Sequence, residues 1–295
     1  MYGGALVAHK IPKTVYIMFI NCRGRLLSLE IPVLMGILNV TPDSFYEGSR
    51  VASQKSLLAQ AEQMLVEGAT ILDIGGVSSR PGATIVTLEE ELKRVIPAVQ
   101  LLHQHFPQAI LSVDTYRAPV AQAAFEAGAH ILNDISGGAL DPALLQTVAA
   151  AKAPYILMHM QGTPQTMQQN PQYEDLMTHI LDFFIDKIGK LQALGVKDIV
   201  LDVGFGFGKT IAHNYQLLAH LNAFTALEFP ILVAVSRKSM IWKVLENSPA
   251  EALNGTTALN IVALQQGAKI LRVHDVKAAS ETLMLWQQLE QAAKV

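Results

Sequence analysis

Eight short apolar runs recur along the chain, and they limit the folds that it can adopt. Each run is rich in Ile, Leu and Val, does not alternate with polar residues, and ends in polar or small residues. Strands of this kind are buried on both faces, as in a parallel sheet covered by helices. The runs are VLMGILN ending at Asn39, TILDIGG around Asp73, AILSVD ending at Asp114, HILND ending at Asp134, PYILMH ending at His159, DIVLD ending at Asp202, ILVAVSR ending at Arg237 and KILRVH ending at His274.

Amphipathic segments rich in Ala, Leu and Gln separate the runs and predict helices. They are residues 53–67, 88–105, 118–127, 142–151, 173–194, 213–221, 255–266 and 276–293, and Gly68, Gly128, Gly195 and Gly267 follow four of them, where helices commonly end. Eight strand–helix units predict an α/β fold, a (β/α)₈ TIM barrel. The alternative is a doubly wound open sheet, which usually carries a Gly-rich loop after its first strand. The first run is followed instead by NVTPDSFYEGSR.

The N-terminal part of the chain predicts a β-hairpin. Residues 13–31 read as two extra strands around the turn at residues 21–24, placed to close the N-terminal end of the barrel. We therefore expect an N-terminal extension and hairpin over residues 1–30 and the barrel over residues 31–295, in a single domain overall.

Composition excludes several classes of protein. Hydrophobic residues make up 51% of the 295 residues, which excludes disorder, and a net charge of −3 gives no field for nucleic acid or an anionic membrane. The apolar run at residues 15–20 is too short for a signal peptide or a membrane span. Cys22 is the only cysteine, which excludes a disulfide scaffold, and we expect a cytoplasmic protein.

The polar residues at the strand ends predict the site, because a barrel brings the carboxyl ends of all its strands together. These residues are Asn39, Asp114, Asn133, Asp134, His159, Asp202, Arg237, Lys238, Arg272 and His274. The middle strands supply Asp114, Asn133 and Asp202, which can pair with a flat heterocycle that carries several N–H donors. Taken singly, each could instead cap a turn or a helix.

The last two strands supply cations. Arg237 and Lys238 follow the seventh run, and Arg272 and His274 end the eighth, where barrels commonly bind phosphate. These side chains predict four cations facing one anion. The alternative for Arg237 and Lys238 is a solvated surface pair.

Three loops near these ends are candidates for substrate contacts. The segment DVGFGFGKT at residues 202–210 fits neither a P-loop nor G-x-G-x-x-G, and its Phe205 and Phe207 could stack on a planar ligand or pack beneath the loop. Residues 39–50 and 75–84 form two long Gly-, Pro- and Ser-rich loops of the kind that close over substrates. Asn39 and Asp43 offer oxygen ligands for Mg²⁺.

Taken together, the motifs resemble the dihydropteroate synthase family over residues 31–280, nearly the whole chain. They are MGILNVTPDSF (35–45), DIGGVSSRPGA (73–83), SVDT (112–115), NDISGG (133–138), MHMQGTP (158–164), DVGFGFGK (202–209), SRKS (236–239) and RVHDV (272–276). The resemblance implies a pterin-binding TIM barrel and a transferase of folate biosynthesis. It would join p-aminobenzoate to 6-hydroxymethyl-7,8-dihydropterin diphosphate, giving 7,8-dihydropteroate and pyrophosphate, as a Mg²⁺-dependent homodimer open to competition by sulfonamides.

The resemblance also implies roles for individual residues. Lys238, Arg272, His274 and Asp114 would be catalytic. The pterin diphosphate would contact Ser79, Asp114, Asn133, Asp202, Lys238, Arg272 and His274. The p-aminobenzoate pocket would include Arg80, Phe207, Lys238 and Ser239, and Asn39 would bind the metal.

Two alternative functions share the pterin-binding side chains. A corrinoid-dependent pterin-binding methyltransferase has no use for a diphosphate site, so Lys238, Arg272 and His274 argue against it. A non-catalytic pterin-binding paralogue would not need these cations or the intact first loop. Pyrophosphate release distinguishes the three functions.

Overall fold

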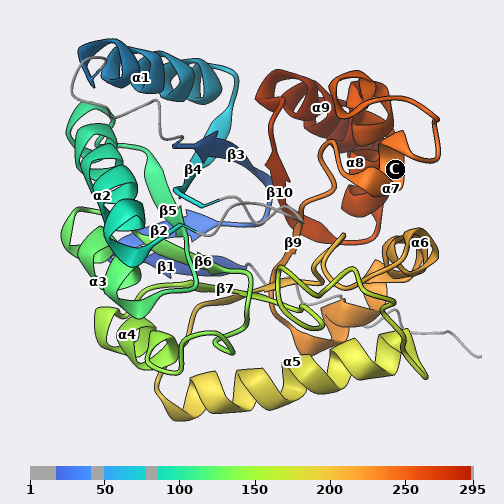
Figure 1. Ribbon diagram of the computed structural model, residues 1–295. Coiled ribbons are helices and arrows are strands. Elements are labelled where there is room, and N and C mark those ends of the chain that lie inside the picture. Colours follow the sequence, from blue (N-terminus) through green and yellow to red (C-terminus); the bar gives the residue numbers. More distant parts are fainter. Residues whose placement is uncertain (1–17, 41–49, 78–85, 294–295) are drawn as a thin grey trace, which may run out of the picture.

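The computed structural model describes residues 18–40, 50–77 and 86–293, and Figure 1 shows their arrangement. Eight parallel strands close into a barrel in the order β10-β3-β4-β5-β6-β7-β8-β9, and the helices form a ring around them. The predicted (β/α)₈ barrel is therefore confirmed, and the doubly wound sheet was the wrong alternative. The barrel strands are β3 (Val33–Asn39), β4 (Ala69–Gly75), β5 (Ile110–Asp114), β6 (Ile131–Asp134), β7 (Tyr155–Met158), β8 (Ile199–Asp202), β9 (Ile231–Val233) and β10 (Ala268–Val273).

The helices follow the amphipathic segments closely. They are α1 (Arg50–Val66), α2 (Leu88–His105), α3 (Ala118–Glu126), α4 (Leu144–Ala151), α5 (Leu176–Ala193), α6 (Ile211–Ala219), α7 (Ser239–Trp242), α8 (Leu253–Gln265) and α9 (Val276–Ala292), with 3₁₀ turns at η2 (Leu221–Leu227) and η3 (Pro249–Glu251). The sequence did not predict α7, which is a single turn after β9. None of the helices in the described ranges is long and apolar enough to cross a membrane.

The predicted hairpin is present and covers one end of the barrel. Its antiparallel strands, β1 (Phe19–Cys22) and β2 (Arg25–Ser28), place Ile20, Cys22 and Leu27 in one buried cluster with inward side chains of the barrel. Burial raises the pKa of Cys22 to about 12, which keeps the thiol protonated. The boundary between residues 1–30 and residues 31–295 stays a prediction.

Two apolar cores hold the barrel together. The inner core contains a buried residue from every barrel strand, and the hairpin closes one end of it. These residues are Met35, Ile71, Ile110, Ile131, Ile156, Val200, Leu232 and Ile270. The larger outer core lies between the strands and the helix ring. With both faces of the sheet buried, the polar side chains at the carboxyl ends of the strands remain to form a site at the other end.

Candidate functional site

Arg272 lies at the centre of the polar network at the barrel mouth. From β10, its Nε donates to Oδ2 of Asp73 at 2.7 Å and its Nη2 donates to Oδ2 of Asp114 at 2.7 Å. Asn133, on β6, donates from Nδ2 to the same oxygen of Asp73 at 3.0 Å. Four strands that are distant in sequence therefore share one network, as the strand-end argument predicted for Arg272, Asp114 and Asn133.

Asp73 is a member of this network that the sequence analysis did not select. It lies two residues before the end of β4 and is fully buried, and its Oδ1 has no hydrogen-bond partner among the described residues. A buried carboxylate is stable only beside a compensating charge, which Arg272 supplies. The missed signal was an aspartate inside an otherwise apolar strand.

The Asp114 carboxyl group has a strongly raised pKa. Burial raises its pKa to about 7, the Arg272 guanidinium opposes this shift, and the negative charge of Asp73 adds to it. The carboxyl group therefore changes its charge near neutral pH.

Asp202 and Lys238 lie near enough to the Arg272 network and to each other for their charges to interact. The Asp202 carboxylate accepts a hydrogen bond from the backbone N–H of Gly204 at 2.7 Å, and burial raises its pKa while Lys238 opposes the shift. Lys238 donates to the carbonyl of Phe205 at 2.5 Å, and its Nζ lies 5.0 Å from the ring centroid of Phe207. Burial lowers the pKa of Lys238 to about 8.

The two aromatic residues of the β8–α6 loop have different positions. Phe205 is fully buried in the outer core. Of the two predicted roles, it therefore packs beneath the loop. Phe207 is half-buried, and its ring lies under the Lys238 ammonium group. Ser239 is half-buried one residue beyond Lys238, at the start of α7.

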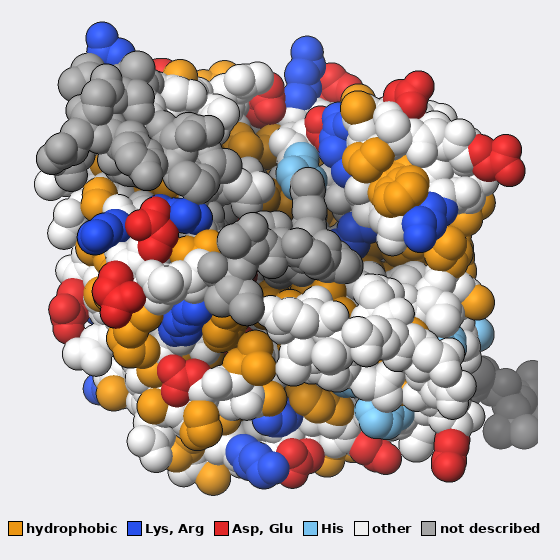
Figure 2. Space-filling model, in the orientation of Figure 1, with side chains coloured by type: hydrophobic (Ala, Val, Ile, Leu, Met, Phe, Trp, Pro, Cys, Tyr) orange, Lys and Arg blue, Asp and Glu red, His pale blue; other side chains and the backbone are white. Residues whose placement is uncertain are grey.

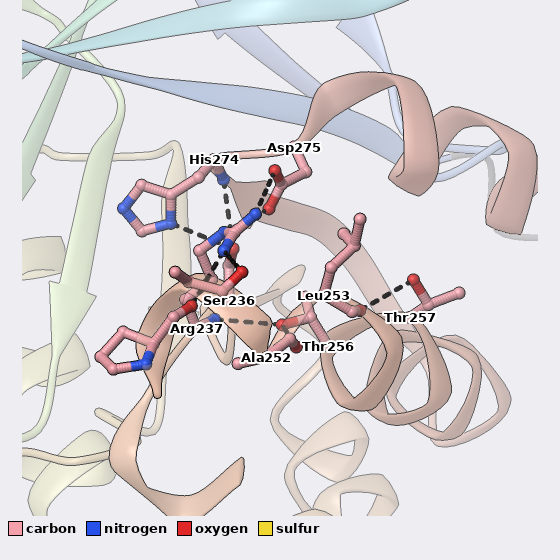
Figure 3. A network of polar contacts seen from close by, with 10 residues as sticks. Ser236, Arg237, Ala252, Leu253, Thr256, Thr257, His274 and Asp275 are labelled. Atoms are coloured by element: carbon pink, nitrogen blue, oxygen red, sulfur yellow. Dashed lines mark hydrogen bonds and ion pairs between the residues drawn. The ribbon is translucent and has the colours of Figure 1, made fainter. Parts of the chain in front are cut away.

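His274 and Arg237 lie in the network drawn in Figure 3. The hydroxyl group of Ser236 is 3.0 Å from Nδ1 of His274 and accepts from its backbone N–H at 3.2 Å. Arg237 forms two hydrogen bonds of 2.8 Å to the Asp275 carboxylate and donates to the carbonyls of Pro249 and Ala250. The guanidinium of Arg237 is turned toward Asp275 (Figure 3), so the expectation that four cations face one anion was wrong for this residue.

Two further strand-end residues have structural contacts. Asp134 accepts hydrogen bonds from Ser136, from the Gly138 N–H and from the hydroxyl of Tyr155, which makes it the cap of the β6–α4 turn. His159 is buried and accepts from Lys209, a residue that the sequence analysis did not select.

Asn39 is exposed at the end of β3 and close to the Arg272 network. A Cβ atom added at Gly75 would lie 3.7 Å from Oδ1 of Asn39 and 3.8 Å from Oδ2 of Asp114, so both oxygens border the same glycine. Within residues 18–40, 50–77 and 86–293, no three His, Cys, Asp or Glu side chains are grouped to hold a metal ion. Asp43, Ser79 and Arg80 lie outside the described residues.

Comparisons with known proteins agree on one family. The family model described as "Pterin binding enzyme" matches residues 35–274. The chain is 45% identical to the dihydropteroate synthase of Escherichia coli K12 over 263 residues, which cover 88% of this chain and 93% of that protein. It is 47% identical to the enzyme of that name from Synechocystis over 251 residues, with 84% and 86% coverage.

Solved structures give the same result. The Yersinia pestis dihydropteroate synthase in a sulfonamide drug complex superposes with a TM-score of 0.87 at 46% identity, covering 93% of this chain and all of that one. The Xanthomonas albilineans enzyme with 4-aminobenzoic acid superposes with a TM-score of 0.85 at 40% identity, covering 93% and 98%.

Proposed function

The chain belongs to the dihydropteroate synthase family of pterin-binding enzymes, and on this premise we propose how its barrel mouth performs the family's reaction. It is a transferase of folate biosynthesis that joins p-aminobenzoate to 6-hydroxymethyl-7,8-dihydropterin diphosphate and releases pyrophosphate. The methyltransferase and non-catalytic alternatives are not favoured, since the curated relatives are dihydropteroate synthases. The observation that carries the proposal is the Arg272 bridge between Asp73 and Asp114, with His274 directly after the same strand and Lys238 after the neighbouring strand β9.

The acidic and amide half of the mouth binds the pterin. Asp114, Asn133 and Asp202 present carboxylate and amide groups from three strands, which suits a ring with a row of N–H donors and ring nitrogens. Asp73 is a positioning residue, because it holds Arg272 and Asn133 at the same oxygen.

The cationic half binds the diphosphate. Arg272 uses two of its N–H groups on Asp73 and Asp114, and the rest of its planar fork can address phosphate oxygens. His274 lies at the end of the same strand, and we place Ser79, from the second loop, against the diphosphate as the family resemblance implies.

p-Aminobenzoate binds between Phe207, Lys238 and Ser239, and the family resemblance assigns Arg80 to the same pocket. The Phe207 ring supplies a flat apolar surface, and Lys238 supplies a charge for the carboxylate or the pterin side. The structure of the X. albilineans relative with 4-aminobenzoic acid supports a site for this substrate in the family.

The reaction needs charge stabilisation more than a strong base. Early cleavage of the C–O bond leaves a polyanion and a developing cation on the pterin methylene group. Arg272 and His274 stabilise the departing diphosphate, and the Asp114 and Asp202 carboxylates stabilise the positive charge on the ring. The aniline nitrogen of p-aminobenzoate then forms the C–N bond to the methylene carbon and gives up one proton, which the departing pyrophosphate or solvent accepts, and orientation by Phe207 and Lys238 supplies most of what that step requires.

The residues at the rim fit a Mg²⁺ ion. Mg²⁺ keeps several waters and takes substrate phosphate oxygens, so one exposed amide oxygen, that of Asn39, suffices from the described residues. Its position beside Gly75 and Asp114 is where a diphosphate held by Arg272 would reach. When bound, the ion would neutralise charge on the diphosphate.

Asp114 should control the acid side of the pH profile. Its raised pKa means that the carboxyl group is neutral below about pH 7 and charged above it, and only the charged form pairs fully with Arg272 and the pterin. We expect kcat/KM for the pterin diphosphate to fall between pH 8 and pH 6. Asp114→Asn should be less active throughout and lose this limb, and an unchanged limb would contradict the assignment.

A homodimer is the assembly that we propose. Exposed apolar side chains gather after β9 and on α8 and α9, and Figure 2 shows hydrophobic side chains over α7 and α8. They are Val244, Leu245, Leu253, Met284, Leu285 and Leu289. Light scattering should give twice the chain mass, and the pair Leu285→Glu and Leu289→Glu should shift it toward one chain. A monomeric parent protein would contradict this.

Turnover tests the proposed function. Mixing the pterin diphosphate, p-aminobenzoate and Mg²⁺ should release pyrophosphate and dihydropteroate in equal amounts. Pterin binding without release would instead favour the non-catalytic function.

We propose that the enzyme is cytoplasmic, because Cys22 is free and buried and the relatives are biosynthetic enzymes.

A further inference from the structure

Lys209 is a buried cation that the reaction described above does not use. It lies in the β8–α6 loop, and only 2% of the residue is exposed. Its Nζ contacts three acceptors: Nδ1 of His159 at 2.9 Å, the carbonyl of His159 at 3.3 Å and the carbonyl of Phe207 at 2.9 Å. Burial lowers the pKa of Lys209 to about 7, opposed by the nearby charge of Asp202. Keeping an ammonium group here is costly unless its acceptors are placed to receive it.

His159 presents a fixed acceptor to this ammonium group. The residue is 1% exposed, and its ring packs edge-on against Phe183 and His179 at centroid distances of 4.9 and 5.5 Å. Burial lowers the pKa of His159 to about 2, so the imidazole is neutral and Nδ1 accepts from the ammonium group. The pair therefore joins the end of β7 to the loop after β8.

Side chains of the loop after β7 also donate to backbone carbonyls of the loop after β8. The Tyr173 hydroxyl donates to the carbonyl of Gly208 at 2.7 Å, and the Gln168 amide donates to that of Gly206 at 2.5 Å. A Cβ atom added at Gly204 would lie 2.0 Å from the carbonyl oxygen of His159, so only glycine permits this approach. Lys209 is the charged, buried member of this set of contacts.

We propose that Lys209 is a positioning residue for p-aminobenzoate, acting through the carbonyl of Phe207 and the side chain of His159. The Lys209 ammonium group holds the Phe207 carbonyl and the His159 side chain in place. This fixes the backbone of Phe207 and therefore the position of its ring, which lies against Lys238. This inference rests on the proposed placement of p-aminobenzoate at Phe207. Asp202, on the pterin side, is held by backbone groups that a change at the Lys209 or His159 side chain leaves in place: the N–H of Gly204 donates to its carboxylate at 2.7 Å and the N–H of His159 donates to its carbonyl at 3.0 Å.

Kinetics of Lys209→Met test the role, because methionine fills the buried space without the ammonium group. We expect KM for p-aminobenzoate to rise tenfold or more, while KM for the pterin diphosphate and kcat at saturation stay within threefold. His159→Phe keeps a ring but removes the acceptor, and it should give the same split. The double variant should be no worse than either single one, because both remove one interaction.

Two comparisons separate positioning from simple destabilisation. Val148→Ala, in the buried face of α4, should lower the melting temperature and leave both KM values unchanged. Hydrogen exchange needs no substrate: in Lys209→Met, exchange should quicken at residues 160–173 and 203–210 and not in α4. Equal rises in both KM values, or unchanged exchange in these loops, would overturn the proposal. If the parent enzyme forms no dihydropteroate, the proposed function fails, and the exchange result still decides whether Lys209 holds the loops.

Discussion

Arg272→Ala should lower kcat/KM for the pterin diphosphate by about 10³-fold, at the upper end of what loss of one preorganised donor costs. The same change leaves Asp73 and Asp114 facing each other without their shared cation. Because removing one partner of a buried ion pair leaves an uncompensated charge, we also expect the free energy of unfolding to fall by about 3–5 kcal/mol. Steady-state kinetics and urea unfolding measure the two effects.

Two further variants isolate the guanidinium of Arg272. Arg272→Lys keeps a positive charge but cannot reach two carboxylates with a planar fork, so its kcat/KM should lie between those of the parent and the alanine variant. Arg23→Ala removes an arginine that donates to the carbonyls of Phe125 and Ala129 at the hairpin end of the barrel, and its kcat/KM should be nearly unchanged. Full turnover by Arg272→Ala would contradict the role given to this residue.

Lys238→Ala should lower kcat/KM by about 10²–10³-fold, and for both substrates. Its ammonium group lies over Phe207 and faces Asp202, so its loss affects the p-aminobenzoate wall and the pterin side together. Burial lowers the pKa of Lys238 to about 8, so the parent enzyme should lose activity as pH rises through 8 and the lysine loses its proton.

The shape of the pH profile gives the control for Lys238. Lys238→Ala should lose this alkaline limb but keep the acid limb of Asp114. Lys238→Met, which keeps an apolar stem over Phe207, should separate the contribution of packing from that of charge. A variant that retains full turnover would contradict the assignment.

The barrel could be predicted from the sequence because its parallel strands are buried on both faces. Eight apolar runs alternated with amphipathic segments, and each became a strand of the closed barrel. The predicted ends of the strands were less accurate. Strand β9 stops at Val233, although its apolar run continues toward Arg237. The short helix α7 has only four residues, too few to give a periodic pattern.

The site could be predicted in part, because a barrel brings its strand ends together. This argument selects the last residues of each strand, and the structure brings two of those selected, Asp114 and Asn133, into one network with Arg272, while their roles in binding stay a prediction. It passed over Asp73, which points into the mouth from inside β4.

Contacts between side chains that are far apart in the chain could not be predicted from the sequence. Arg237 binds Asp275, 38 residues away, and Lys209 binds His159, 50 residues away. Neither contact follows from spacing or periodicity, because each depends on how two loops pack once the barrel has closed.

Calorimetric binding of the two halves of the substrate tests most directly whether the mouth is divided in two. With 6-hydroxymethylpterin as one ligand and pyrophosphate with Mg²⁺ as the other, Asp202→Asn should weaken the pterin at least tenfold and leave pyrophosphate within threefold. His274→Ala should weaken pyrophosphate binding at least tenfold and leave pterin binding within threefold, because it removes a group from the cationic half only. Equal weakening of both ligands by either variant, or no weakening by either, would contradict a pterin half and a diphosphate half at the barrel mouth.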